Sequence, residues 1–230
     1  MISDIDRFYA LLGRLASLPG QGRPLRSYTG RDRWPERGVC FFREPGELRA
    51  GGNVPRIVFV GTHAVTRNSR STLWRRLHAH RGAQDGRGNH RGSIFRLHVG
   101  AALLRRNGAG EVIDSWGVGQ SAPRAVRERE VPHERRVSSH IGSMSVLWVA
   151  VLDEPGATSA RAFIKRNAIA LLSRQGRRVD PPSGTWLGLH SERDEIRRSG
   201  LWNLDHVMED HDPAFLDVLE ESVDAMEGGR

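Results

Sequence analysis

Arginine and histidine are concentrated between residues 73 and 92, where they surround a few apolar side chains. Arg75 and Arg76 stand in a segment with helical spacing, and His80 follows one turn later. A guanidinium group can hold a phosphate through two parallel hydrogen bonds, and a histidine can exchange a proton near neutral pH. These residues favour a phosphate-binding site, although solvent-exposed helix residues would give the same pattern.

The charge of the chain is divided unevenly along its length. There are 35 basic and 27 acidic residues, and Lys165 is the single lysine, so 34 of the basic residues are arginine. Residues 201–230 hold nine acidic residues and one basic residue, which leaves an excess of 16 positive charges over residues 1–200. A body this basic attracts polyanions through counterion release, which makes nucleic acid the first partner to expect. An arginine-rich composition inherited from a GC-rich genome would produce the same counts.

A glycine-rich stretch, residues 81–92, follows the arginine-bearing segment and contains little that could be buried. Two interpretations stay open for it. It is either a flexible surface loop or a loop whose Asn89, His90 and Arg91 contact nucleic-acid phosphates.

Two further groups of residues could do chemistry, and each has a structural alternative. Cys40 would act as a nucleophile only beside an activating base, and a buried thiol in a strand is the simpler interpretation. Four potential metal ligands follow one another closely at Asn203, Asp205, His206 and Glu209. Their spacing is not diagnostic of a metal site, and a capped turn before the last helix explains them as well.

The elements that must position these residues follow from the apolar patterns. Three β-prone segments are expected to form strands, near residues 38–43, 56–61 and 146–152, and the first two form an antiparallel hairpin with a long polar connection. Helices are expected around them, near residues 2–16, 73–80, 94–106, 121–136, 158–174, 192–198 and from 213 onward. The fold class is therefore α/β, with one small, mainly antiparallel sheet of about three strands flanked by helices and helical extensions at both ends.

The order of these features resembles the GIY-YIG nuclease superfamily. Gly38-Val39-Cys40 lies in the first strand, Phe59-Val60-Gly61 ends the second, a helix with an arginine pair follows, and Ile164–Leu172 is similar to the family's later helix. The resemblance covers residues 38–175. It divides the chain into an N-terminal helix and linker (1–37), a GIY-YIG-like domain (38–175) and a C-terminal helical extension with an acidic tail (176–230).

The resemblance implies a Mg²⁺-dependent endonuclease that hydrolyses phosphodiester bonds in DNA, and it assigns roles to particular positions. Arg76 matches the arginine that contacts the phosphate, and His80 matches a histidine that assists the family's tyrosine in some restriction enzymes. Cys40 and Phe59 stand at the two tyrosine positions, and Lys165 stands at the position of the metal-binding glutamate. His63 follows the second strand and is the substitute base to expect if water is still activated. Arg75 is expected to contact nucleic acid beside Arg76.

These replacements leave three hypotheses open. In the first, the chain is a DNA endonuclease that either retains its activity or has lost it through Lys165. An ammonium group at this position repels the divalent ion that the reaction needs. Alternatively, it is a non-catalytic nucleic-acid-binding or regulatory module on the same fold. In the third hypothesis, the acidic C-terminal helix masks the basic face until a partner displaces it.

The remaining expectations concern membrane contact, cellular location and oligomeric state. No apolar run is long enough to cross a bilayer, so no membrane contact is expected. A single cysteine cannot form an internal disulfide, and with no secretory leader at residues 1–15 a cytoplasmic location is expected. A homodimer stays open.

Overall fold

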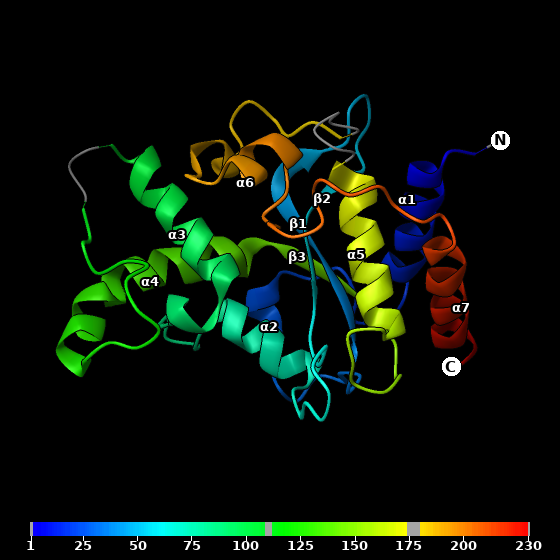
Figure 1. Ribbon diagram of the computed structural model, residues 1–230, viewed down its shortest axis with the longest axis horizontal. Coiled ribbons are helices and arrows are strands. Elements are labelled where there is room, and N and C mark those ends of the chain that lie inside the picture. The colour runs from blue at the N-terminus through cyan, green and yellow to red at the C-terminus, as the bar shows by residue number, and fades with distance from the viewer. Residues whose placement is uncertain (1, 109–111, 174–179, 230) are drawn as a thin grey trace.

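A computed structural model describes residues 2–108, 112–173 and 180–229 (Figure 1). Within them, three strands form one antiparallel sheet in the order β2-β1-β3. β1 (Gly38–Leu48) lies in the centre, between β2 (Pro55–Thr62) and β3 (Ser145–Ala150). The α/β class, the antiparallel hairpin and the small sheet expected from the sequence are therefore confirmed.

Side chains of β1 alternate between two layers of the core, as in any strand buried on both faces. Val39 and Phe41 join one layer, and Cys40 and Phe42 join the other. The pairing of β1 with β2 shifts its register after Phe42, and there Val58 and Phe59 both join the second layer. Phe59 pairs with Phe42 and so lies on the same side of the sheet as Cys40, and the shift adds Val58 to that side.

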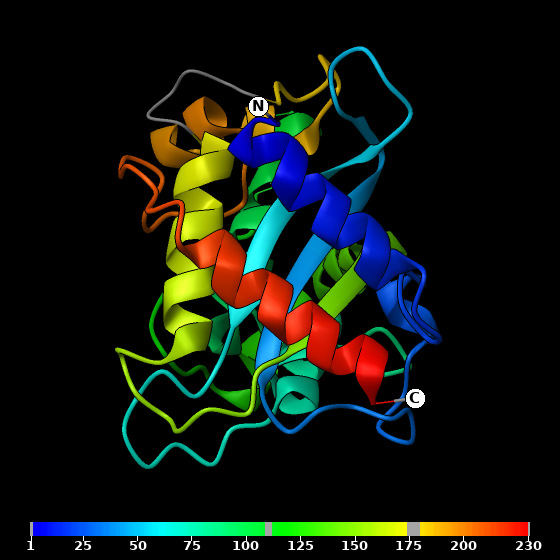
Figure 2. The same cartoon turned by 90° about the vertical axis from the view of Figure 1, so that its right-hand side faces the viewer.

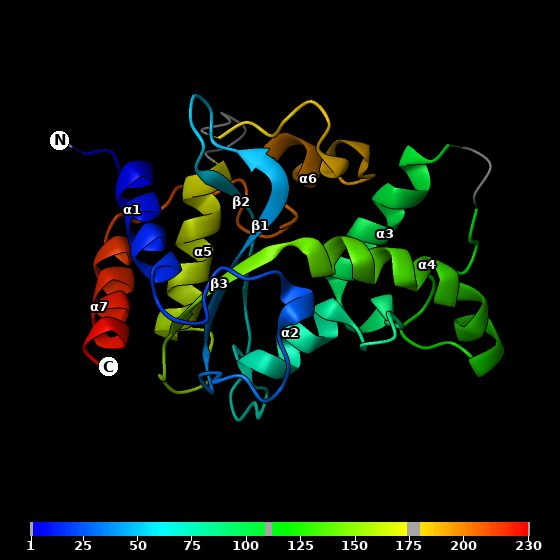
Figure 3. The ribbon, with the colours of Figure 1, turned by 180° about the vertical axis from the view of Figure 1, so that it is seen from behind.

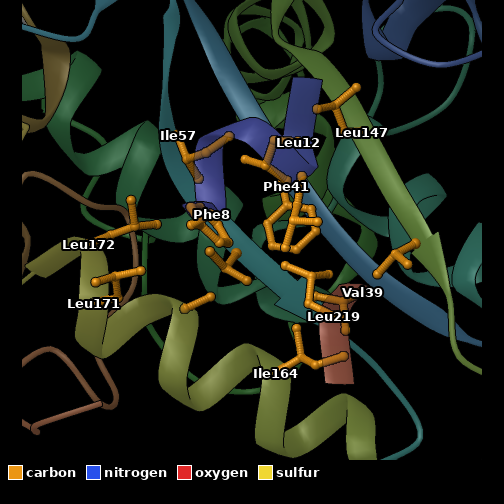
Figure 4. Packing of buried hydrophobic residues seen from close by; sticks show 14 of the residues in the cluster. Phe8, Leu12, Val39, Phe41, Ile57, Leu147, Ile164, Leu171, Leu172 and Leu219 are labelled. Atoms are coloured by element: carbon orange, nitrogen blue, oxygen red, sulfur yellow. The ribbon is translucent and has the colours of Figure 1, made fainter. Parts of the chain in front are cut away.

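Three helices cover the first layer, and α1 and α7 cross the sheet beside α5 (Figure 2). They are α1 (Asp4–Ala16), α5 (Ala160–Ser173) and α7 (Phe215–Gly228). Phe8 and Leu12 of α1, Ile164 of α5 and Leu219 of α7 pack around Phe41 (Figure 4). The two terminal helices thus contribute directly to the hydrophobic core.

The second layer is covered by helices from the middle of the chain (Figure 3). They are α2 (Leu73–Arg81), α3 (Ile94–Arg106) and α4 (Arg124–Ser143). Shorter elements complete the fold, namely η1 (Leu25–Ser27), η2 (His90–Gly92), η4 (Leu187–His190) and α6 (Asp194–Ser199). In the described part of the chain, no helix is both long and apolar enough for a membrane span.

Side-chain amides pair with the backbone at both outer strands of the sheet. The Gln21 amide accepts from the Trp148 backbone N–H at 2.9 Å and donates to the Trp148 carbonyl at 2.8 Å. The Asn203 amide makes the same two bonds to Val60 of β2, both at 2.9 Å. Each amide therefore takes the place of a neighbouring strand.

The polar connection expected after residue 43 is shorter than predicted, because β1 continues to Leu48. Two glutamates of this extension are buried and fully engaged. Glu44 accepts from the indole N–H groups of Trp186 and Trp202, and Glu47 forms a buried ion pair with Arg56 at 2.9 Å. Internal partners allow these charged residues to continue a buried strand.

The charge-dense segment expected as a solvated helix face is α4, and one of its faces is buried. Glu130 forms an ion pair with Arg91 at 2.7 Å, and Glu134 binds Arg96 and His90. The solvated interpretation was wrong for these two glutamates, because arginines from another segment neutralise them inside the protein.

Candidate functional site

A cavity of about 160 Å³ opens beside the end of β2. The first turns of α2 and α3, the middle of α5 and the segment 202–205 enclose it. Its walls are formed by Phe59, Val60, Gly61, Thr62, Arg76, Ile94, Phe95, Lys165, Trp202, Asn203, Leu204 and Asp205. Phe59, Arg76 and Lys165, which the sequence singled out, therefore meet at one place.

Helix packing sets the positions of the two basic side chains. Thr72 caps α2, since its hydroxyl accepts from the Arg75 N–H, and the helix buries Leu73 and Leu77 in the second layer. Arg76 precedes Leu77 and lines the cavity. In α5, Ile164 is buried in the first layer, and the next residue, Lys165, also lines the cavity.

The cavity is electropositive and short of acidic partners. Burial lowers the pKa of Arg76 and of Lys165, and for Lys165 the nearby Arg76 lowers it further while Asp205 raises it. In the part of the chain that the structure describes, Arg76 forms no ion pair. Among the residues that the structure describes, Asp205 is the one carboxylate on the wall, against two cations. Such an arrangement favours a bound anion.

Two glycines allow the close packing beneath the cavity. A Cβ on Gly38 would lie 2.3 Å from the Val149 carbonyl oxygen, inside the pairing of β1 with β3. A Cβ on Gly61 would lie 2.9 Å from the Cys40 sulfur and 3.0 Å from the Phe59 ring. Both positions therefore require glycine for steric reasons rather than for an unusual backbone angle.

Cys40 lies beneath the wall of the cavity rather than on it. Its thiol is buried and donates to the Gly61 carbonyl at 3.3 Å. Burial raises the pKa of Cys40 to about 12, against the opposing effect of Arg76 and Lys165. The thiol is therefore neutral, and the arrangement does not support Cys40 as a nucleophile.

His80 and His63 are both buried, and neither is part of the cavity wall. His80 bonds to the Ser93 hydroxyl at 2.7 Å and packs edge-on against the Phe59 ring. His63 donates through Nδ1 to the Ser71 carbonyl at 3.0 Å. Burial lowers the pKa of His63 to about 4 and that of His80 well below its usual value, so both are neutral at pH 7.

The loop residues expected to contact phosphates are engaged within the protein. His90 is buried between Glu134 and the Trp116 ring, and the Arg91 guanidinium, 3% exposed, donates to both Glu130 oxygens. A phosphate contact by Arg91 would require this ion pair to break. Asn89 is exposed and caps η2, and Arg75 is exposed on α2.

The segment 202–205 forms one wall, and the sequence suggested Asn203 and Asp205 only as part of a metal site or a capped turn. The Trp202 N–H donates to the Val58 carbonyl at 2.7 Å, and Asn203 binds Val60 as described above. Of the four ligands considered for a metal, His206 instead bonds to Glu209 at 2.8 Å, and Asp205 reaches the cavity. The run of polar residues was the only signal in the sequence, and it suggested a metal site or a capped turn rather than the wall of a cavity.

Comparison with known protein families gives a match to the GIY-YIG domain over residues 1–228. The chain belongs to the GIY-YIG domain family. The resemblance seen in the sequence is therefore confirmed, and the match includes the terminal helices α1 and α7. The division of the chain at residues 37 and 175 stays a prediction. Searches of curated proteins and of solved structures give no match.

GIY-YIG proteins are typically nucleases that use a metal ion, so the cavity must be compared with that requirement. A divalent ion such as Mg²⁺ is held by oxygen ligands, usually one or two carboxylates. Here Asp205 is opposed by Arg76 and by the Lys165 ammonium. Among the described residues, no cluster of three or more His, Cys, Asp or Glu side chains could hold a metal. The donor set does not fit Mg²⁺.

Proposed function

We propose that this GIY-YIG domain binds the phosphodiester backbone of DNA without a metal ion, with one phosphate seated between Arg76 and Lys165. The observation that carries the proposal is that these two cations line one cavity in which, within the described ranges, only Asp205 opposes them. A phosphate between them would be bound by a guanidinium fork on one side and an ammonium group on the other.

The charge of the rest of the chain supports the same partner. The excess of 16 positive charges before residue 201 provides a long-range attraction for a polyanion. Membership of a family whose members are typically nucleases also favours DNA over an acidic protein.

Metal-dependent hydrolysis of DNA is the second candidate function, and the presence of Arg76 in the cavity favours it. Hydrolysis needs a group that activates water and a centre that stabilises the leaving oxygen. Cys40 and Phe59 supply no phenol, and His63 and His80 are buried away from the cavity wall. Lys165 could neutralise charge on a phosphate, but it cannot ligate Mg²⁺. Binding without cleavage is therefore the function that these residues support best.

Equilibrium binding of a labelled DNA duplex tests the proposal. We expect R76Q and K165Q each to weaken binding about tenfold, the effect of one charge-assisted hydrogen bond. The matched control is R106Q, which removes an exposed charge at the far end of α3. Affinity should be the same with Mg²⁺ and with a chelator. Equal losses in all three variants would contradict the proposed site.

A cleavage assay separates the two functions. Supercoiled plasmid incubated with the unmodified chain and Mg²⁺ or Mn²⁺ should stay intact. Metal-dependent nicking that disappears in R76Q would establish the second candidate instead.

A further inference from the structure

We infer that a second phosphate subsite adjoins the cavity at Arg70 and Arg75, so that the DNA backbone continues from the cavity along the first turn of α2. The inference rests on the proposed function and extends it by naming the direction in which the bound strand leaves the cavity.

A second hollow, of about 390 Å³, lies beside the cavity and is lined by Arg70, Ser71, Arg75, Arg76 and Ala79. Arg76 belongs to both hollows and is the one residue that they share. Arg76 therefore borders both the cavity and the second hollow. Consecutive phosphates of one strand could occupy both hollows, with Arg76 between them.

The charges of the second hollow are available to a ligand. Arg70 and Arg75 are exposed, and none of the described residues that line the hollow is acidic. In the described parts of the chain, neither arginine forms an ion pair. By contrast, Arg91 and Arg96 are neutralised by internal glutamates. Three neighbouring guanidinium groups without a carboxylate among them fit a run of phosphates.

The backbone around these arginines is anchored to the sheet. His63, directly after β2, donates to the Ser71 carbonyl at 3.0 Å, and the Ser69 hydroxyl accepts from the Ser71 N–H at 3.3 Å. The Thr72 hydroxyl then caps α2 by accepting from the Arg75 N–H. These bonds constrain the backbone from Ser69 to Arg75, from which the Arg70 and Arg75 side chains extend.

The salt dependence of duplex binding tests the inference, because each lost phosphate contact lowers the slope of log affinity against log salt by about one. The double variant Arg70→Gln/Arg75→Gln should lower this slope by about two and weaken binding at least tenfold near physiological salt. The matched control, Arg124→Gln/Arg127→Gln, removes two exposed charges at the start of α4 and should leave the slope almost unchanged.

A dinucleotide with a single phosphodiester separates the two subsites, with binding followed by NMR chemical-shift changes. R76Q should weaken its binding, and the Arg70→Gln/Arg75→Gln variant should leave it unchanged.

Each contrary outcome points to a different error. An unchanged salt slope in the Arg70→Gln/Arg75→Gln variant, with a reduced slope in R76Q, would overturn the second subsite and leave the proposed function standing. Absence of duplex binding by the unmodified chain at low salt would overturn both. Equal affinity for polyglutamate of matched charge would overturn the assignment to nucleic acid.

Discussion

Arg76 of α2 and Lys165 of α5 line the same cavity, and the positive charge of Arg76 lowers the pKa of Lys165. Two cations held this close repel each other unless an anion lies between them. Asp205 supplies part of this negative charge, since it raises the pKa of Lys165. A bound phosphate would supply the remainder.

Replacing Lys165 by glutamate should convert the cavity from an anion site to a cation site. Lys165→Glu places a second carboxylate beside Asp205, so we expect it to bind Mn²⁺ in a calorimetric titration and to lose affinity for DNA. Lys165→Gln is the control, and equal Mn²⁺ binding by both variants would show that the two carboxylates do not converge.

Gly61→Ala should destabilise the fold by about 1–3 kcal/mol, because the new methyl group would overlap the Cys40 sulfur and the Phe59 ring. Urea unfolding measures the loss. Cys40→Ala combined with Gly61→Ala should cost less than the sum of the two single changes, because it removes one of the two overlaps. Simple additivity would mean that Cys40 and Gly61 are not in contact.

Asn203→Ala should lower the free energy of unfolding by about 2 kcal/mol, since it leaves the buried Val60 N–H without a partner. Asn203→Asp keeps an acceptor for that N–H, but it turns a carboxylate oxygen toward the Val60 carbonyl oxygen, so it should also destabilise the fold. The same variants should weaken DNA binding, because Asn203 holds the wall that carries Asp205. Unchanged stability in both variants would contradict the strand-like pairing.

Stability should fall as the pH is lowered from about 6.5 toward 4. The folded-state pKa of His63 is about 4 and that of His80 is well below 6.5, so in this range the unfolded chain binds protons that the folded chain does not. Urea unfolding at pH 7.5 and 5.5 should show the loss. His63→Gln should reduce the difference between the two pH values, whereas replacing the exposed His190 should not. An unreduced difference would assign the effect to other groups.

The acidic residues of α7 should not regulate DNA binding. Glu220 pairs with Arg7, Glu227 pairs with Arg14 at 2.6 Å, and no residue of α7 lines the cavity. Glu220→Gln/Glu227→Gln should therefore leave DNA affinity at fixed salt within about twofold, in keeping with the small energies of exposed ion pairs. A marked increase would support the masking hypothesis. Deleting α7 would not test it, because Phe215 and Leu219 belong to the core.

Local patterns were sufficient to predict most helices and all three strands. The helix over residues 94–106 has the bounds of α3, and the apolar segments near 38, 56 and 146 are β1, β2 and β3. In each of these segments, the spacing of its own apolar residues indicates a helix or a strand. Arg76 and Lys165 could likewise be proposed as one site, because the order of the motifs resembled a family that the comparison confirms.

The rest depended on partners that lie far away in the chain. Asn203 and Val60 are 143 positions apart, and nothing near either residue predicts their bonds. Glu134 of α4 has the sequence surroundings of a solvated residue, yet it is buried because Arg96 lies opposite it. His80 has the spacing of a catalytic residue, and only the packing of Phe59 and Ser93 shows it to be enclosed.

The amides of Gln21 and Asn203 also limit how copies of this chain can associate. An unpaired outer strand can template the addition of a strand from another molecule, which leads to sheet-extended dimers or to aggregates. Here Trp148 of β3 and Val60 of β2 already have both backbone groups bonded to an amide side chain of the same molecule. If the protein forms a homodimer, its interface must therefore be made by helices and loops rather than by a continuous sheet across two copies.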